Sequence, residues 1–274
     1  NGLAKGYASL SVYHPNMLDP ENNYIDIAVH YMHAGMFNEG IALLASLDKV
    51  SNPLVHYYLA WFYAQADQSL KVEEELTKAN RKSIDYCFPY RWESELVLKH
   101  AVERSDQKSQ ALYLLGNLLY DRRPEDAVVA WEESLQSNDV LGMVNRNLAF
   151  AAFHFENDID KAIALLGKAI TKDPSHAQWY GELAEYYDHS AQDYTTCLKE
   201  MNENLEVVKR DINAPKSLIK LYNLRGNYDD AIELLSKHHF RTWEGGRVIY
   251  HYYVDAHCLK ALELLNDGKI EIAI

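Results

Sequence analysis

Apolar residues recur along most of this chain at the three- and four-residue spacing of helices that bury one face. Small residues mark the positions where two helices would touch, and large apolar residues mark those where helices would interlock. The pattern is clearest from Leu148 through Ala162 to Pro174, and the same skeleton returns between Tyr222 and Leu235. No alternation of apolar and polar residues indicates a strand. The sequence therefore predicts an all-α chain built from consecutive helix pairs.

These helix pairs recur about every 34 residues, which is the period of tetratricopeptide repeats. Such pairs stack into a right-handed superhelix, and this is the predicted fold. We expect residues 1–20 to form a lead-in segment and residues 21–274 to form one solenoid of about seven helix pairs. An amphipathic stretch predicts an extra helix near residues 90–104. The last repeat is expected to be cut short at Ile274.

The charge balance bears on the class of partner. The chain has 274 residues, with 27 Lys and Arg against 40 Asp and Glu, and a formal net charge of −13. Such a surface repels a phosphate backbone, so nucleic acid is not an expected partner. No apolar run approaches the roughly 20 residues that cross a bilayer, and no membrane insertion is expected. The chain opens on Asn1 without a signal-like segment, which predicts a fragment or a mature product. The compartment is left open, with the cytoplasm favoured.

Cysteines and histidines show no arrangement typical of a metal site. Cys87, Cys197 and Cys258 lie far apart, each within an apparent helical pattern, and they are predicted to be buried free thiols. His30 and His33 are one helical turn apart, but the sequence indicates no third ligand. We therefore expect neither a metal nor another cofactor.

Four stretches resemble a particular family. They are residues 85–89 (DYCFP), 115–121 (LGNLLYD), 146–149 (RNLA), and Phe240 followed by 243–246 (WEGG). In these respects the chain resembles bacterial proteins in which a galactose-mutarotase-like β-sandwich of unknown function precedes a C-terminal tetratricopeptide array. The turn after Asp121 is one residue shorter than in that family, and the segment after Gly246 is also shorter. The resemblance implies that this chain is a scaffold and that any carbohydrate-related activity lies in the N-terminal domain.

Polar residues concentrate on the first helices of the third to fifth pairs, which would line the concave face of the superhelix. We predict a groove there for a protein or peptide segment, including the N-terminal half of its own full-length protein. Arg146→Ala is expected to weaken binding and leave folding intact. The alternative is an ordinary solvated helix face. The predicted groove residues are Asn117, Tyr120, Asp121, Arg146, Asn147, Phe150, Phe153, His154, Glu185, Asp188 and His189.

Three other kinds of site bear on the function: a carboxylate clamp, a glycan contact and a catalytic site. A clamp for a C-terminal carboxylate is excluded, because Tyr113, Gln178 and Glu182 occupy the places that would need cations. The segment Trp243, Glu244, Gly245 and Gly246 suggests a glycan-contacting accessory domain of a larger carbohydrate-active enzyme. Alternatively, Trp243 only fastens this segment to neighbouring helices. Catalysis is not expected, because no nucleophile–base pair or separately placed pair of carboxylates is indicated.

Overall fold

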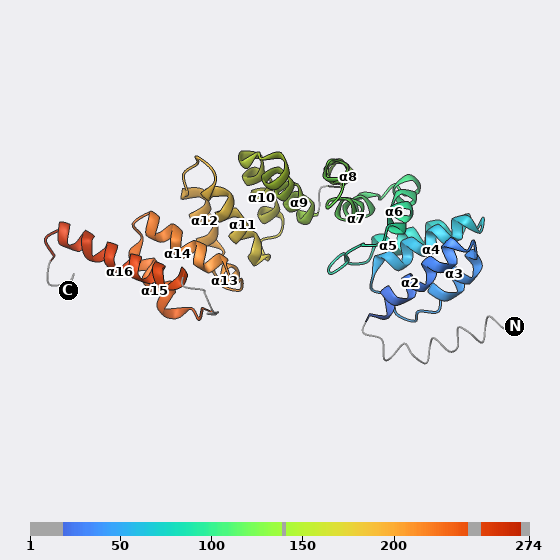
Figure 1. Ribbon diagram of the computed structural model, residues 1–274, viewed down its shortest axis with the longest axis horizontal. Helices are drawn as coiled ribbons and strands as arrows, with labels where there is room; N and C mark the ends of the chain where they lie inside the picture. The colour runs from blue at the N-terminus through green and yellow to red at the C-terminus, as the bar shows by residue number, and fades with distance from the viewer. Residues whose placement is uncertain (1–18, 139–140, 241–247, 270–274) are drawn as a thin grey trace. The chain divides into compact units, whose positions relative to one another are not determined.

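The computed structural model describes residues 19–138, 141–240 and 248–269, and the regular elements in these ranges are all helices. The prediction of an all-α chain of tetratricopeptide-like helix pairs is confirmed for these residues (Figure 1). The chain divides into two compact units, residues 1–140 and 141–274, and each is described by itself. The single solenoid over residues 21–274 and the lead-in of residues 1–20 stay predictions. None of the described helices is both long enough and apolar enough to cross a membrane.

Within residues 19–138, the first unit has three helix pairs and one additional helix. Helix α6 packs against α4 and α7 and stands between the second and third pairs. Helices α2, α4 and α8 each have a proline in the first turn, where its missing N–H leaves no intrahelical bond unmade. The pairs are α2 (Pro20–His33) with α3 (Phe37–Leu44), α4 (Pro53–Gln65) with α5 (Ser69–Asn80), and α7 (Ser109–Leu119) with α8 (Pro124–Ser137), and α6 spans Glu93–Arg104.

Helix α4 lies at the centre of the first unit. Every residue from Pro53 to Phe62 is buried, which fits a helix that contacts α3, α5 and α6 and is apolar on nearly all sides. The Tyr57 hydroxyl donates to Asn80 Oδ1 at 2.9 Å. The Tyr58 hydroxyl shares a hydrogen bond of 2.9 Å with Ser94 Oγ. Both buried hydroxyls are thus paired, as burial of polar groups requires.

Glycines allow close helix contacts in this unit. A Cβ at Gly40 on α3 would lie 2.5 Å from Phe62 Cε1 on α4. A Cβ at Gly116 on α7 would lie 2.3 Å from Trp131 Nε1 on α8. The small residue at Gly40 therefore serves packing against the next pair, whereas Gly116 serves packing within its own pair.

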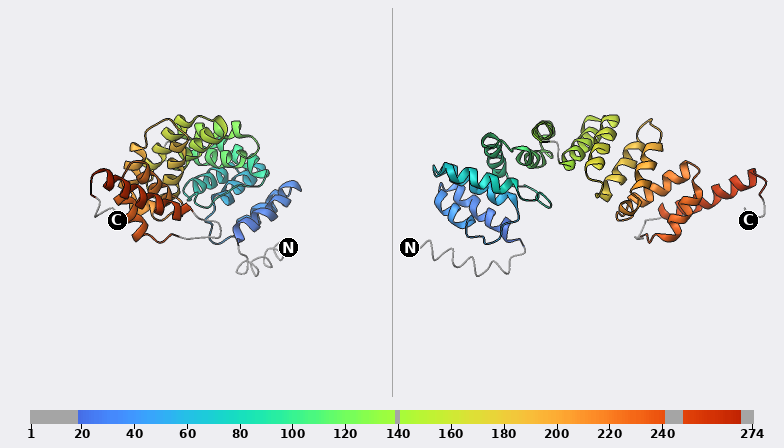
Figure 2. Two further views of the ribbon diagram at one scale, coloured as in Figure 1. Left: turned by 60° about the vertical axis from the view of Figure 1, so that its left-hand side comes forward. Right: turned by 180° about the vertical axis from the view of Figure 1, so that it is seen from behind.

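Within residues 141–240 and 248–269, the second unit continues the pairing (Figures 1 and 2). The π-helix η2 (Ala152–Glu156) extends the first helix, the short α13 (Leu205–Val208) follows α12, and α16 (Val248–Asn266) packs against α14 and α15. The pairs are α9 (Gly142–Ala151) with α10 (Ile159–Lys172), α11 (Ala177–Asp188) with α12 (Thr195–Glu203), and α14 (Ala214–Leu224) with α15 (Tyr228–Lys237).

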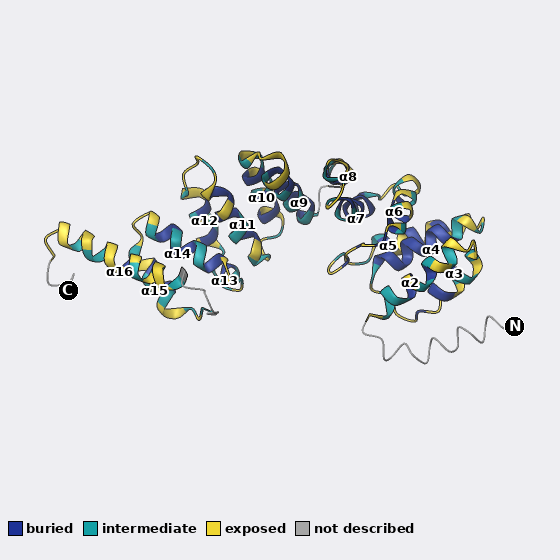
Figure 3. Ribbon diagram, in the orientation of Figure 1, coloured by how far each residue is buried: buried dark blue, intermediate teal, exposed yellow. Residues whose placement is uncertain are grey.

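The prediction of buried free thiols is confirmed for Cys87 and for Cys197, which lies in α12, and is wrong for Cys258. Cys87 is buried in a non-helical segment before α6, and Cys258 is exposed on α16. Much of the described surface of α16 is exposed, so a residue at helical spacing there need not be buried (Figure 3). Burial raises the pKa of the Cys87 and Cys197 thiols to about 12, so both stay protonated at neutral pH.

Candidate interaction site on the first helices of the second unit

A pocket of about 520 Å³ lies on the second unit, where the first helices of three successive pairs meet. Side chains from α9, η2 and α11 line it, together with residues at the start of α14. Its volume is in the range of protein sites that bind small molecules or side chains. The lining residues are Arg146, Phe150, His154, Gln178, Gly181, Glu182, Glu185, Tyr186, Asp188, Asp211, Asn213 and Ser217.

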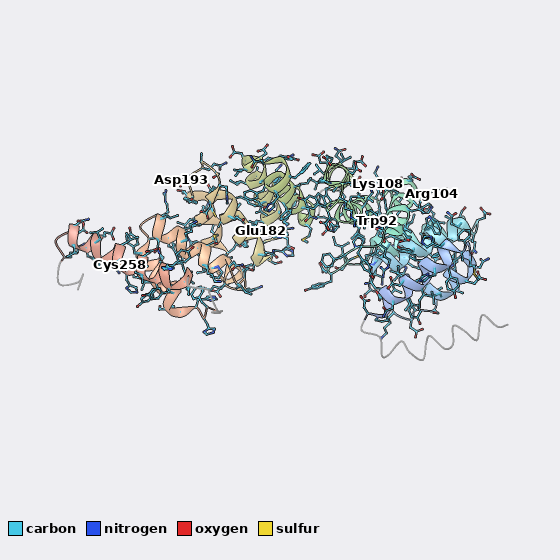
Figure 4. The ribbon with its side chains drawn as sticks, viewed as in Figure 1. Trp92, Arg104, Lys108, Glu182, Asp193 and Cys258 are labelled. Atoms are coloured by element: carbon cyan, nitrogen blue, oxygen red, sulfur yellow. The ribbon has the colours of Figure 1, made fainter. Side chains whose placement is uncertain are left out.

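A bidentate ion pair between Arg146 and Glu182 forms one wall of the pocket. Arg146 Nε donates to Glu182 Oε2 at 2.9 Å, and Arg146 Nη2 donates to Glu182 Oε1 at 2.5 Å. Gln178 Nε2 also donates to Glu182 Oε1 at 3.1 Å. The Arg146 and Glu182 side chains are 23% and 13% exposed, and Glu182 is labelled on α11 in Figure 4. Because Glu182 neutralises Arg146, the pair joins α9 to α11 and offers little net positive charge to a ligand.

The π-helix places aromatic side chains at the edge of this wall. It ends at Asn157, which has a positive φ of 56°, and the Asp158 N–H donates to Ala152 O at 2.8 Å. The His154 ring centroid lies 4.2 Å from that of Phe150, and the Arg146 guanidinium lies 5.0 Å from the Phe150 ring centre. Local π-helices are often found at functional sites. His154 belongs to this π-helix and lines the pocket.

Phe153 lies behind the pocket lining. Its ring stacks on Tyr186 with centroids 4.4 Å apart. It also lies nearly perpendicular to the His189 ring, with centroids 5.3 Å apart. It packs against the buried core of the second unit. His189 is held in turn by a 2.9 Å hydrogen bond between Nδ1 and the Glu185 carbonyl. Phe153 and His189 thus support the pocket from outside its lining.

Carboxylates dominate the charge of the pocket. Asp188 pairs with Lys220 on α14 at 2.5 Å. Burial alone would lower the pKa of Lys220, but the hydrogen bond and charge of Asp188 raise it. Asp211 accepts hydrogen bonds from the Asn213 and Ala214 N–H groups at 2.7 and 2.8 Å, at the start of α14.

Glu185 is exposed and has no ion-pair partner among the residues that the structure describes. The charge in the pocket that no ion pair neutralises is therefore negative.

The structure brings several predicted groove residues together and separates others. Arg146, Phe150, His154, Glu185 and Asp188 line the pocket, and Phe153 and His189 lie beside it. Asn147 accepts from Arg146 Nη1 at 3.4 Å. The remaining three belong to the first unit.

In the first unit, Asn117 and Tyr120 are engaged with Trp131. Asn117 Oδ1 accepts from Trp131 Nε1 at 3.2 Å, and the Tyr120 ring centroid lies 5.3 Å from that of Trp131. Asp121 is exposed in the turn after α7. These contacts give Asn117 and Tyr120 a packing role within the third pair.

Trp243, Glu244, Gly245 and Gly246 lie outside the described residues. No group of three or more His, Cys, Asp or Glu side chains in the described ranges is arranged to hold a metal ion.

Sequence reasoning missed several pocket residues. In the sequence, Gln178 and Glu182 stand out only as mismatches to a carboxylate clamp, although their four-residue spacing places them on one helix face with Tyr186. Asp211 stands three residues before Ala214, a spacing typical of a helix start. These signals indicate a shared face and a cap, but they do not show that the two meet in one pocket.

No protein-family model matches the chain, and several solved structures are distantly similar to it. The structure of MamA is 16% identical and has a TM-score of 0.43, covering 68% of this chain and 94% of MamA. The C-terminal part of a TPR repeat-containing protein from Cytophaga hutchinsonii is 13% identical, with a TM-score of 0.44 and coverages of 90% and 92%. Pseudomonas aeruginosa PilF is 15% identical, with a TM-score of 0.44 and coverages of 85% and 96%. At these values, none of the similarities assigns a function.

Proposed function

We propose that this chain is a non-catalytic interaction scaffold that binds a segment of a partner protein in the pocket formed by α9, η2, α11 and α14. The observation that carries this proposal is that the first helices of three successive pairs line one pocket of about 520 Å³. Repeat arrays suit this task because each pair adds a few side chains to a shared surface. The alternative, an ordinary solvated helix face, does not require a pocket.

The charge of the pocket favours a basic partner segment. Arg146 is neutralised by Glu182 and Asp188 by Lys220, which leaves Glu185 and Asp211 as further carboxylates on the lining. The Phe150 and His154 rings line the same pocket as these carboxylates and offer apolar area to the stem of a lysine or arginine. We infer that a basic side chain of the partner enters the pocket, while its neighbours contact the helix faces around it.

The proposal includes a further contact surface and a candidate partner. Asn117, Tyr120 and Asp121 are proposed as a separate contact of the first unit, taken by itself. The resemblance to proteins with a galactose-mutarotase-like domain makes the N-terminal half of the full-length protein a candidate partner. The glycan-contacting alternative depends on Trp243 and Glu244, and no observation on the described residues favours it.

Binding to an array of immobilised peptides that differ in net charge tests the proposal. Wild-type protein is expected to prefer basic peptides. Glu185→Lys places a cation in the pocket and is expected to weaken binding of those peptides at least about tenfold, because like charges then face each other. Arg146→Ala is unsuitable as the main test, because it also removes a link between α9 and α11.

Glu203→Lys is the matched control, since Glu203 is an exposed residue of α12 in the same pair and does not line the pocket. Both variants change the net charge equally. If both weaken binding to the same degree, the attraction comes from the overall charge and the pocket is not the site. Capture of the separately expressed N-terminal half by wild type, and its loss with Glu185→Lys, would identify the partner as part of the same protein.

A further inference from the structure

A row of exposed aromatic side chains precedes α6 in the first unit. Tyr86, Phe88, Tyr90 and Trp92 are 94%, 67%, 61% and 53% exposed, and the residues between them, Cys87, Pro89 and Arg91, are buried. Tyr86 lies in a turn and Trp92 is the N-cap residue of α6, and the residues between them alternate between buried and exposed as in an extended chain. We call the four exposed residues the aromatic strip, and Figure 4 labels its last member, Trp92.

The buried residues between the rings fix the strip to the first unit. Arg91 is 7% exposed and donates to Asp26 Oδ1 at 2.6 Å, to the Asn22 carbonyl at 2.8 Å and to Asn22 Oδ1 at 3.0 Å. Cys87 Sγ lies 3.4 Å from Asn52 Oδ1, the residue that caps α4. These contacts tie the segment to α2 and α4. The rings are therefore held outward by an anchored backbone and are not the tips of a loose loop.

Two of the four rings already have the guanidinium group of an arginine from the same chain close to them. The Arg91 guanidinium lies 4.1 Å from the Tyr90 ring centre, and that of Arg122 lies 5.0 Å from the Trp92 ring centre. Tyr86 and Phe88 have no such cation among the described residues. Beside them, Asp85 is exposed and has no ion-pair partner in the described part of the chain. The open half of the strip thus combines two uncovered rings with an unpaired carboxylate.

We propose that the aromatic strip docks an extended, arginine-bearing segment of another protein, whose guanidinium groups stack on Tyr86 and Phe88 and pair with Asp85. A guanidinium is attracted to the face of an aromatic ring and to a carboxylate. Arg91 makes both contacts in the same strip, with the Tyr90 ring and with Asp26. Alternate side chains of an extended segment point to the same side about 7 Å apart, so an extended partner can present two arginines to one surface. This surface is distinct from the pocket of the second unit.

Other occupants fit the strip less well. A glycan needs several hydrogen-bonding groups around the rings, but Arg91 turns inward and is used by Asn22 and Asp26, which leaves Asp85 as the charged group beside Tyr86 and Phe88. Nucleic acid is disfavoured by the net charge of −13, and a second copy of the chain would bring the same charge. Charge complementarity therefore selects a basic protein segment.

The test measures binding of a fluorescently labelled peptide of about ten residues, alternating arginine and threonine, to the full chain by anisotropy. The lysine–threonine peptide has the same charge without a planar guanidinium, and the glutamate–threonine peptide has the opposite charge. We expect the arginine peptide to bind at least about threefold tighter than the lysine peptide. The glutamate peptide is expected not to bind.

Variants assign the binding to the strip. Phe88→Ala and Asp85→Asn are each expected to weaken binding of the arginine peptide about three- to fivefold. Tyr86→Gly is expected to do the same without loss of thermal stability, because Tyr86 has a positive φ of 57° that glycine adopts more readily. It therefore separates binding from folding.

Asp106→Asn and Tyr250→Ala are the controls, since they remove an exposed charge and an exposed ring elsewhere, and they should change binding less than about twofold. Equal losses for Asp85→Asn and Asp106→Asn, or equal affinity for the arginine and lysine peptides, would overturn the proposal. So would binding of a soluble oligosaccharide through Tyr86 and Phe88 without binding of the arginine peptide. Because the proposed pocket of the second unit also favours basic side chains and Glu185 lines it, the peptides are compared on the Glu185→Lys variant as well. Loss of the remaining binding when Phe88→Ala or Asp85→Asn is added to Glu185→Lys reports on the strip, and the loss caused by Glu185→Lys alone reports on the pocket, so failure of one is distinguishable from failure of the other.

Discussion

Two helical glycines differ in what surrounds them. Gly116 is in the interior of α7, directly against the Trp131 ring, whereas a Cβ at Gly167 in α10 would meet nothing within 4 Å. Trp131 is 3% exposed, and its Nε1 donates to Tyr113 O and to Asn117 Oδ1, both at 3.2 Å. The ring therefore has both close neighbours and hydrogen bonds that hold it in place.

Alanine at these two positions is expected to have opposite effects. Gly116→Ala should lower the free energy of unfolding by about 1–2 kcal/mol, because the clash with Trp131 outweighs the gain in helix propensity. Gly167→Ala should raise it by about 0.5–1 kcal/mol, because alanine loses less conformational freedom in a helix. Urea denaturation followed by circular dichroism measures both. A stabilising Gly116→Ala would show that the contact with Trp131 is not close.

At the scale of the helix, Arg146 and Glu182 link neighbouring pairs. They are 36 residues apart in the sequence, and the ion pair connects α9 directly to α11. The prediction that Arg146→Ala leaves folding intact assumed a side chain directed only at a partner. Since both groups are largely shielded from water, removal of either leaves a charge that is costly to bury.

Arg146→Ala and Glu182→Ala are each expected to lower the free energy of unfolding by about 1–3 kcal/mol. The double variant should be clearly more stable than the sum of the two losses implies, because neither charge is then left unpaired. A double-mutant cycle from urea denaturation gives the coupling energy. A coupling near zero would mean that the pair does not hold α9 to α11 in solution, and Arg146 would again be usable as a pure binding variant.

Two helices depart from the regular pattern that the sequence indicates. The apolar stripe through Leu198, Met201 and Leu205 predicts one second helix in the fifth pair, but α12 ends at Glu203 and α13 begins at Leu205. The end of α9 continues as a π-helix that the spacing of apolar residues does not indicate. There the stacking of Phe153 on Tyr186, a contact with another helix, accompanies the change of helix type.

At the scale of the whole molecule, carboxylates outnumber cations, and the pKa values of these carboxylates make the stability of the folded chain depend on pH. Glu75 is 5% exposed and lies 2.7 Å from His56 and 2.7 Å from Lys78. Burial alone would raise its pKa, but the hydrogen bonds and charges of His56 and Lys78 outweigh burial and lower it. The unfolded chain therefore binds a proton at this carboxyl more readily than the folded chain. The resulting stability is present above the unfolded pKa and is lost as the pH falls through the folded value.

We expect the free energy of unfolding to decrease as the pH falls below about 4.5, the ordinary pKa of this group. Glu75→Gln should be less stable than wild type by about 1–2 kcal/mol at neutral pH and should lose less stability between about pH 5 and pH 3. Glu73→Gln is the control, because Glu73 is an exposed residue of the same helix. Parallel pH curves for wild type and Glu75→Gln would exclude Glu75 as a source of the acid sensitivity.

The sequence determined the helix pairs, because the features that specify them act locally. Proline at helix starts, Gly35 and Gly226 at positive φ in turns, and apolar residues at helical spacing each restrict only a few neighbouring residues. The same local pattern also indicated that polar residues such as Arg146, Glu185 and Asp188 share the first helices of the central pairs. It therefore identified part of the pocket wall without showing that a pocket exists.

Only the tertiary structure decided which side chains meet. Glu182 on α11 neutralises Arg146 on α9 across 36 residues of sequence, and Asp211 joins the same pocket because α14 packs against α11. The aromatic strip likewise depends on Arg91, which turns inward to α2 and leaves Tyr86 and Phe88 exposed. The spacing of residues in one helix specifies a face, but the depth and angle at which that face packs come from the combined shape of its neighbours.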